Sequence, residues 1–396
     1  MIIPSIDIMG GRAVQLVGGS RMELDCGDPL ELADRFSIYG QIAVIDLDAA
    51  MGLGQNEDLL IEIARRYPCR LGGGVRDADK LTRFLDAGAR AVIIGTRAEP
   101  DFLSGFPRDR LVAALDTRNG TVSVAGWKMD TGLDSAARLV ELAPFVGGFL
   151  FTSIEREGAL GGLDLDYAER IAEQARSAGF SGSLCFAGGV RSAEEVARLD
   201  AMGADVQAGM AIYKGILDPA DALMACLSSD RSDGLWPTVV CDERGVALGL
   251  AYSDSESLGT AFRERAGVYR SRRHGLWRKG ETSGNRQELL RVDVDCDRDT
   301  LRFTVRQGGS GFCHRGSRSC WGPAPGNCPE SADSGIGRLE RTIAGRKAEL
   351  DLDTAPAASY SARLFRDDAL LSAKLLEEAS ELAEASGPER AAEEAA

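Results

Sequence analysis

Short apolar runs alternate with amphipathic stretches over residues 1–226. Eight of these runs have the apolar, β-branched character of buried strands, and segments with helical periodicity lie between most of them. Eight strands that alternate with helices in about 225 residues predict an α/β fold, a (β/α)8 TIM barrel, although an open doubly wound sheet shows the same alternation. The predicted strands are residues 1–7, 42–48, 69–73, 91–96, 111–116, 148–153, 183–189 and 204–209.

An internal repeat favours the closed barrel. Residues 71–96 align with residues 186–211, and both segments read Gly-Gly-Val-Arg, then a helical pattern, then a short strand that ends in glycine. Arg76 and Arg191 are 115 residues apart, and the aspartates that end the first strand of each half are 109 residues apart. A unit of four strand–helix pairs that occurs twice predicts a barrel made of two half-barrels.

The pattern changes after a Ser/Asp-rich joint at residues 227–234. Apolar and polar residues then alternate with a period of two, which predicts a small β-rich α+β domain over residues 234–328. Beyond a second polar joint, helical periodicity and an excess of acidic residues predict a partial all-α segment over residues 336–396.

Composition narrows the class of protein. A chain of 396 residues is too long for one ordinary core, and a formal net charge of −15 argues against nucleic acid or an anionic membrane as a partner, although not against small phosphorylated ligands. The N-terminal residues lack a signal-peptide pattern, and no apolar stretch approaches the length of about 18 that a membrane span needs. Nine scattered cysteines do not form a disulfide framework, so we expect a cytoplasmic protein.

Chemistry in a barrel is expected at the carboxyl ends of the strands. Asp7 and Asp116 both lie there, on opposite sides of the ring, and form a candidate acid–base pair. One such aspartate often only caps a turn, but two at repeat-equivalent positions favour catalysis. Glycines after strands three, four, seven and eight predict two anion sites, one in each half. The candidate binding residues are Gly73, Gly74, Arg76, Gly95, Thr96, Gly188, Gly189 and Gly209.

Residues 1–226 resemble the barrel of histidine biosynthesis that isomerises ProFAR, phosphoribosylformimino-5-aminoimidazole carboxamide ribotide. The shared motifs include "IIPSIDI", "VIDLDAA", "LGGGVR", "LDTRNG" and "AGGVR". The resemblance implies an Amadori rearrangement without a cofactor, with Asp7 as the general base at C2 and Asp116 as the general acid that opens the ribose ring. It also implies that Trp127 stacks on the substrate. Gln15 and Glu157, within "EREGA", depart from the usual pattern.

Two alternatives stay open for the barrel. The cyclase subunit of imidazole glycerol phosphate synthase is a sister family with the same half-barrel repeat and both aspartates. The motif "VIDLDAA", the tryptophan loop and Gln15 favour the isomerase. A non-catalytic barrel that only docks a partner is the second alternative.

The stretch "VDVDCDRDTL", residues 292–301, places carboxylates around a cysteine. If it is a strand, Asp295, Asp297 and Asp299 face one side and suit Mg2+, whereas Cys296 faces the other side and suits Zn2+. Three cysteines would leave the fourth tetrahedral position for water, as in catalytic zinc sites. The alternatives are a solvated strand face for the carboxylates and buried filler roles for the cysteines.

Residues of about 234–322 resemble phosphoribosyl-AMP cyclohydrolase, through "LWRKGETSGN", "DCDRD" and "CHRGSRSC". The resemblance implies Mg2+ at the three aspartates and Zn2+ that activates the water attacking C6 of the adenine ring. It further implies a homodimer in which Cys296 of one chain joins Cys313 and Cys320 of the other. His314 is a candidate proton shuttle, and His274 is expected at the surface.

The last segment resembles the start of phosphoribosyl-ATP pyrophosphohydrolase, an all-α family that uses Mg2+. Glu378 and Glu381 lie at i and i+3 on one helical face and could share an ion, although the sequence alone favours a solvated helix face. The family's second acidic motif would continue just after Glu394, so we expect little or no activity from this segment. The three resemblances together predict a multifunctional enzyme with small phosphorylated ribonucleotide substrates, and neither nucleic acid nor membrane as a partner.

Overall fold

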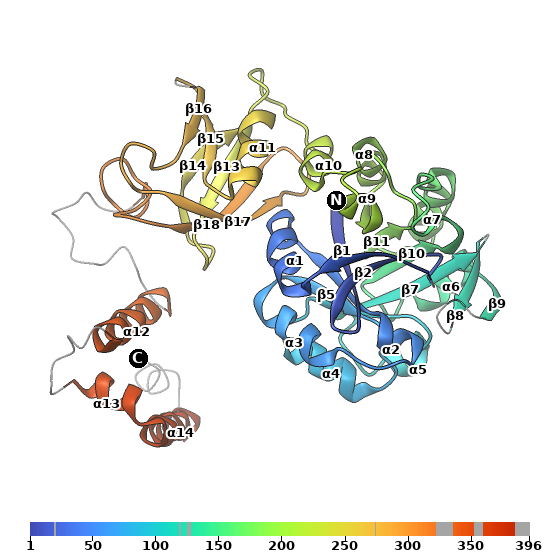
Figure 1. The fold of residues 1–396 in the computed structure, drawn as a ribbon, viewed down its shortest axis with the longest axis horizontal. Coiled ribbons are helices and arrows are strands. Elements are labelled where there is room, and N and C mark those ends of the chain that lie inside the picture. The colour runs from blue at the N-terminus through green and yellow to red at the C-terminus, as the bar shows by residue number, and fades with distance from the viewer. Residues whose placement is uncertain are drawn as a thin grey trace. The chain divides into compact units, whose positions relative to one another are not determined.

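The computed structural model describes residues 1–19, 21–118, 120–124, 127, 129–273, 275–321, 336–351 and 359–384. The chain divides into two compact units, residues 1–321 and residues 322–396, and each is described by itself. The first unit contains the barrel and a strand-rich region, and the second contains helices (Figure 1).

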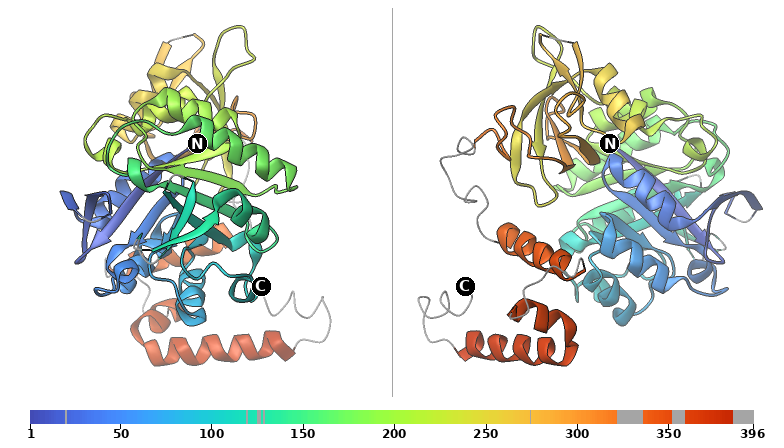
Figure 2. Two further views of the ribbon diagram at one scale, coloured as in Figure 1. Left: turned by 90° about the vertical axis from the view of Figure 1, so that its right-hand side faces the viewer. Right: turned by 60° about the vertical axis from the view of Figure 1, so that its left-hand side comes forward.

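Eight parallel strands form a closed barrel in residues 1–226. Their order is β1-β4-β5-β6-β7-β10-β11-β12, and β12 returns to pair with β1. The TIM barrel predicted from the repeat is therefore confirmed, and each strand coincides with a predicted apolar run (Figures 1 and 2). The strands are β1 Ile2–Met9, β4 Ile42–Asp46, β5 Cys69–Gly72, β6 Ala91–Ile94, β7 Leu111–Arg118, β10 Gly148–Ser153, β11 Ser183–Ala187 and β12 Ala204–Ala208.

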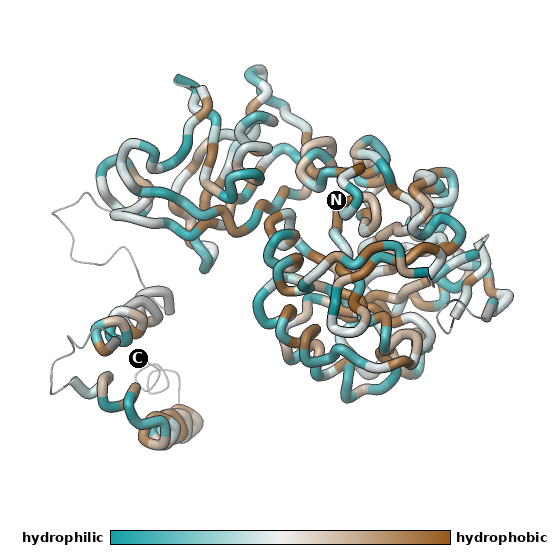
Figure 3. The backbone as a smooth tube through the Cα atoms, in the orientation of Figure 1, coloured by the Kyte–Doolittle hydropathy of each residue, from teal (hydrophilic) through white to brown (hydrophobic). Residues whose placement is uncertain are grey.

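Helices cover the outside of these strands and bury one apolar face each. The helices α4 (Ala78–Asp86) and α8 (Ala193–Ala201) occupy equivalent positions of the repeat. Each is preceded by a capping residue, Asp77 or Ser192, whose side chain accepts a hydrogen bond from a backbone N–H of the first turn. The strands form the apolar centre of the barrel (Figure 3). The other helices are α1 Pro29–Phe36, η1 Ser37–Tyr39, α2 Leu47–Met51, α3 Glu57–Arg66, α5 Pro100–Leu103, η2 Arg108–Arg110, α6 Ser135–Leu142, η3 Ile154–Arg156, α7 Leu165–Ser177, α9 Met210–Tyr213 and α10 Pro219–Ala225.

Two antiparallel hairpins extend the barrel at its first and fifth parallel strands. Strands β2 (Arg12–Val17) and β3 (Arg21–Gly27) continue from β1, and β8 (Thr121–Val124) and β9 (Met129–Asp134) continue from β7. We call them the first and second hairpin arms. They occupy repeat-equivalent places, and the apolar pattern did not predict them.

The strand-rich region, residues 236–307, forms a four-stranded sheet in the order β14-β13-β18-β17, with a separate hairpin β15-β16. A continuous strand over residues 292–301 is not observed. β17 ends at Val294 and β18 begins at Leu301, so the carboxylates lie on the turn between them and that part of the prediction is wrong. The elements are β13 Trp236–Cys241, β14 Ala247–Ser253, α11 Ser255–Glu264, β15 Val268–Ser271, β16 Gly275–Arg278, β17 Gln287–Val294 and β18 Leu301–Gln307.

One apolar core joins the barrel to this sheet. Ile38 of η1 and Leu223 of α10 are buried in the same cluster as Trp236, Leu258 and Val292. Tyr39 also packs on Phe262, with ring centroids 4.7 Å apart. Residues 1–321 therefore share buried apolar surface across the joint at 227–234.

The second unit is helical, as the periodicity predicted. It contains α12 (Ile336–Asp351), α13 (Tyr360–Arg366) and α14 (Asp368–Glu384), and the Ser359 side chain caps α13 by accepting the Ala362 N–H. None of the helices in the described residues has the length and apolar character that crossing a bilayer requires.

Candidate functional site

A cavity of about 240 Å³ opens at the carboxyl ends of the barrel strands. It lies where chemistry is expected in this fold, and the strands bring together residues from both sequence halves. The predicted catalytic and binding residues of the barrel line it: Asp7, Gly73, Gly74, Arg76, Gly95, Thr96, Asp116, Trp127, Gly188, Gly189 and Gly209.

Asp7 and Asp116 face this cavity from strands on opposite sides of the ring. Ser5 and Gln15 donate hydrogen bonds to Asp7, at 2.9 and 3.2 Å. Loss of water around Asp7 outweighs these bonds and raises its pKa to about 6. Burial likewise raises the pKa of Asp116, against hydrogen bonds from Trp127 and Thr152. The pKa of each carboxyl is therefore closer to neutral pH than the pKa of an exposed aspartate, as general acid–base catalysis requires.

Glu157 adds a third carboxyl group to the cavity. Burial and, to a smaller extent, the negative charges of Asp7 and Asp116 raise its pKa to about 8. Glu157 therefore carries a proton at neutral pH. The sequence signalled this residue only as a departure from a familiar motif, and its place in the same cavity as the aspartates follows from the turn after β10.

The two hairpin arms meet over the cavity. The ring of Trp127, from the second arm, lies against Gly19 of the first arm, where any side chain would collide with it. Gly18 of the first arm also donates its N–H to the carbonyl of Glu157 at 3.3 Å. The arms thus hold the tryptophan, the glutamate and Gln15 around the aspartates.

Glycines bring the backbone close to neighbouring strands at the two predicted anion sites. Gly73 and Gly188 have φ values of +96° and +95°, and a Cβ at either position would collide with the backbone of Asp46 or Ser153. Only glycine fits such a place without strain. The two halves of the barrel therefore repeat the same close approach at the cavity edge.

A turn at residues 295–300, the carboxylate turn, gathers three aspartates in the strand-rich region. One oxygen from each of Asp295, Asp297 and Asp299 lies within 4.8 Å of the others. Partial burial acts to raise the pKa of Asp295, but N–H groups of Thr300 and Asp299 donate to it and leave the pKa below its usual range. Three converging oxygen ligands, one of them held ionised, suit a hard divalent cation.

The three cysteines predicted to bind zinc occupy two separate places in the described part of the chain. Cys313 and Cys320 are hydrogen-bonded to each other on the loop 313–320, and the N–H of Arg315 lowers the pKa of Cys313. Cys296 is exposed on the carboxylate turn, and the structure does not bring the three sulfurs together within one chain. His314 is exposed beside Cys313.

Two predicted residues remain apart from any cluster. Glu378 and Glu381 are exposed on α14, and no third ligand joins them within the described residues of this unit. Glu394 and His274 lie outside the described residues.

The fold and the cavity define the class: a TIM barrel built from two half-barrels, with paired carboxyls across its mouth. The family model described as Histidine biosynthesis protein matches residues 1–218, and the chain belongs to this family. Models for phosphoribosyl-AMP cyclohydrolase and phosphoribosyl-ATP pyrophosphohydrolase match residues 249–322 and 336–396. The resemblances drawn from the sequence are confirmed.

Curated relatives agree with these matches. An imidazole carboxamide isomerase of Gemmatimonas aurantiaca is 36% identical over 54% of this chain and 94% of its own length. The name of this relative describes a substrate with two phosphoribosyl groups. A histidine biosynthesis bifunctional protein of Schizosaccharomyces pombe is 46% identical over 44% of this chain, and a trifunctional protein of Neurospora crassa is 47% identical over 46%. The matched region spans 38% and 19% of the lengths of these two proteins.

Proposed function

We propose that the chain is a multifunctional enzyme of histidine biosynthesis whose barrel isomerises ProFAR. The observation that carries this proposal is the cavity in which Asp7 and Asp116 lie on opposite strands with pKa values raised by burial. Asp7, as the carboxylate, removes the C2 proton, and Asp116 in its acid form protonates the ribose ring oxygen as the ring opens. The name of the G. aurantiaca relative supports this substrate.

The surrounding residues serve binding and orientation in this proposal. The repeated glycine approaches at Gly73 and Gly188 receive the two phosphate groups, so the reacting carbon lies between the aspartates. Trp127 stacks on the substrate while its N–H orients Asp116. Neutral Glu157 spares the two aspartates a third negative charge in the same cavity.

We infer that the strand-rich region hydrolyses phosphoribosyl-AMP with the help of two kinds of metal ion. Asp295, Asp297 and Asp299 would hold Mg2+, and Cys313 and Cys320 would hold Zn2+ together with Cys296 of a second copy. Bound zinc supplies Lewis acidity that activates water. A homodimer is proposed because one chain leaves Cys296 apart from the other two thiols, and His314 beside them moves the proton. The eight cysteines in the described part of the chain are free, which fits a cytoplasmic enzyme.

The helical unit is proposed to provide phosphoribosyl-ATP pyrophosphohydrolase chemistry, with Glu378 and Glu381 as Mg2+ ligands. The family match supports this assignment. No third ligand joins the two glutamates among the described residues of this unit, so of the three proposed activities this one has the least support from the structure.

The two central activities are tested on one preparation. Purified chain should convert ProFAR, and it should hydrolyse phosphoribosyl-AMP in proportion to its zinc content. Chelation that removes zinc should abolish the hydrolysis and leave the isomerisation unchanged, because the barrel uses no metal. Equal loss of both reactions on chelation, or hydrolysis without zinc, would contradict the proposal.

A further inference from the structure

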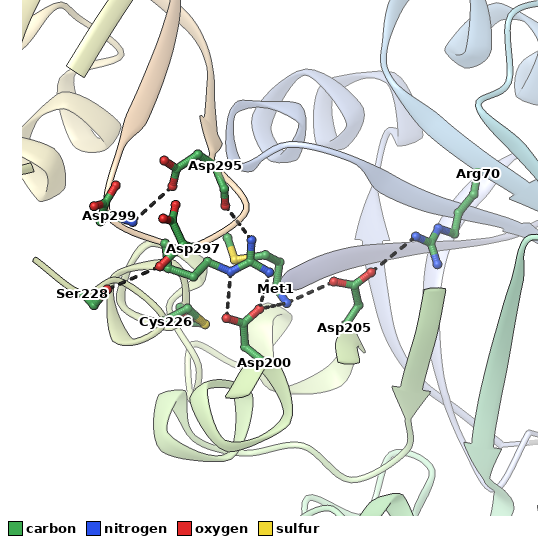
Figure 4. Close-up of polar contacts among 11 residues, drawn as sticks. Met1, Arg70, Asp200, Asp205, Cys226, Ser228, Asp295, Asp297 and Asp299 are labelled. Atoms are coloured by element: carbon green, nitrogen blue, oxygen red, sulfur yellow. Dashed lines mark hydrogen bonds and ion pairs between the residues drawn. The ribbon is translucent and has the colours of Figure 1, made fainter. Parts of the chain in front are cut away.

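The carboxylate turn contacts the barrel as well as its own sheet. Arg298 of this turn donates from Nε and Nη2 to the two carboxylate oxygens of Asp200 on α8, each at 2.9 Å. Its Nη1 donates to the main-chain oxygen of Asp295 at 2.8 Å. Dashed lines in Figure 4 mark these contacts, which connect Asp200 on the barrel side with the turn that carries Asp295, Asp297 and Asp299. One guanidinium thus fastens the start of the turn to the barrel.

Arg298 makes these contacts from a costly backbone conformation. Its φ is +68°, a region that residues other than glycine rarely adopt and that persists where the surroundings over-determine it. The Asp200 side chain is only 7% exposed, so solvent screens this ion pair less than a surface pair. The planar fork of arginine matches both carboxylate oxygens at once. The interaction with the barrel therefore accounts for an arginine where glycine would be unstrained.

The joint between barrel and sheet restrains the same turn. The N–H of Ser228 donates to the carbonyl of Arg298 at 2.9 Å, and its hydroxyl donates to the carbonyl of Asp297 at 3.5 Å. Trp236 in turn donates to the carbonyl of Ser228 at 2.6 Å. Two consecutive carbonyls of the carboxylate turn are therefore held from the barrel side.

The barrel repeat shows that this helix forms in the first half without a carboxylate at the position of Asp200. Counting back the repeat length of 115 residues from Asp200 gives Leu85 on α4, which packs on the barrel core. Asp200 also lies outside the set of residues that line the barrel cavity. The first half thus forms the same helix with an apolar residue at this place, and the carboxylate of the second half bonds Arg298 across the joint as well as the Met1 amino group within the barrel.

We propose that Asp200, acting through Arg298, is a positioning residue for Asp295, Asp297 and Asp299, so that cation binding beside the sheet depends on the barrel. The proposal rests on the cation site proposed above. Ligands hold an ion well only when their own hydrogen bonds fix them, and loss of such support typically costs 10- to 100-fold in affinity. Loosening the turn should therefore weaken binding although all three ligands remain.

Titration of the full-length chain with Mn2+ tests this, with affinity measured by calorimetry. Asp200→Asn and Arg298→Gly should each weaken binding about tenfold. Glycine accepts the backbone conformation at residue 298, so this variant removes the bridge without adding strain. Because Asp200 also accepts a hydrogen bond from the Met1 amino group at 2.8 Å, the double variant is needed, and it should be no weaker than either single variant.

Matched controls separate the outcomes. Asp86→Asn, at an exposed position on α4, should keep wild-type affinity, and Asp295→Asn should abolish binding. The Thr300 amide, which donates to Asp295, should exchange with solvent faster in both bridge variants. Wild-type affinity in both would overturn the positioning role and leave the cation site standing, and additive losses would overturn the route through Arg298. No Mn2+ binding by the unaltered chain would overturn the cation site and this proposal together.

Discussion

Asp7, Asp116 and Glu157 share one cavity, and each has its pKa raised chiefly by burial. Asp7→Asn and Asp116→Asn should each lower ProFAR turnover by about 10²- to 10⁴-fold, because each removes one proton-transfer group. Steady-state kinetics would show the loss in kcat. The melting temperature should not fall, since asparagine has nearly the same shape and relieves a buried charge. Near wild-type turnover in both variants would contradict the catalytic roles.

The pKa values also predict a bell-shaped pH dependence of the isomerase. Activity should rise through about pH 6 as Asp7 becomes a base, and fall at higher pH as Asp116 loses the proton that it donates and, near pH 8, as Glu157 adds a third negative charge. Glu157→Gln should remove the part of the alkaline fall near pH 8 and keep the acid limb. An unchanged alkaline limb in this variant would assign that fall to another group.

The free energy of unfolding should also depend on the protonation of these buried carboxyls. Asp7 and Glu157 are protonated in the folded chain at pH values where the unfolded chain has lost those protons, so the unfolding free energy decreases as pH rises from about 4 to about 8. Glu157→Gln should flatten the upper half of this decline. Thermal unfolding of both chains between pH 5 and pH 9 measures it, and parallel curves would contradict the buried ionisation of Glu157.

Among single residues, the sequence predicted Asp7 and Asp116 because they lie at equivalent positions of the repeat. It did not predict the roles of Glu157 and Asp200. Both act through neighbours that are distant in sequence: Glu157 through Asp7 and Asp116, and Asp200 through a residue 98 positions away. No local pattern records such pairs.

Among the elements, the hairpin arms connect the barrel strands to the mouth of the cavity. Trp127→Phe keeps a ring over Gly19 but removes the N–H that bonds Asp116, and Trp127→Ala removes both. We expect a modest fall in kcat for phenylalanine and a fall of about 10- to 100-fold in kcat/KM for alanine. Trp321→Ala, at an exposed tryptophan, is the control. Equal kinetics in the alanine variant and the unaltered chain would show that the tryptophan is only packing.

Strands were predicted correctly where they are buried along their whole length, and the prediction failed where a turn sets the ends of the strands. The eight barrel strands are buried on both faces, so their apolar runs are continuous and easily recognised. The arms are short and mixed in character, and they follow their parallel strands without a break in the pattern. The carboxylate turn was mistaken for strand because Arg298 takes a left-handed conformation that no glycine or asparagine announces.

For the whole first unit, the shared apolar core predicts coupled unfolding. Leu223 of α10 is fully buried against the sheet, so Leu223→Ala should cost about 2–4 kcal/mol, and both isomerase and cyclohydrolase activity should be lost at one lowered temperature. Leu53→Ala, at a leucine that is 72% exposed, should change neither. Loss of the two activities at well-separated temperatures would show that the two regions unfold independently.

The joint at residues 227–234 also limits how such a chain can change by recombination. A cyclohydrolase region exchanged from another protein would arrive without partners for Leu223 and Asp200, and it would leave a buried leucine and a carboxylate facing the wrong surface. Successful exchange would have to carry parts of α8 and α10 with it. A unit of residues 1–321 that could be exchanged without loss of packing would therefore have to include residues on both sides of this joint.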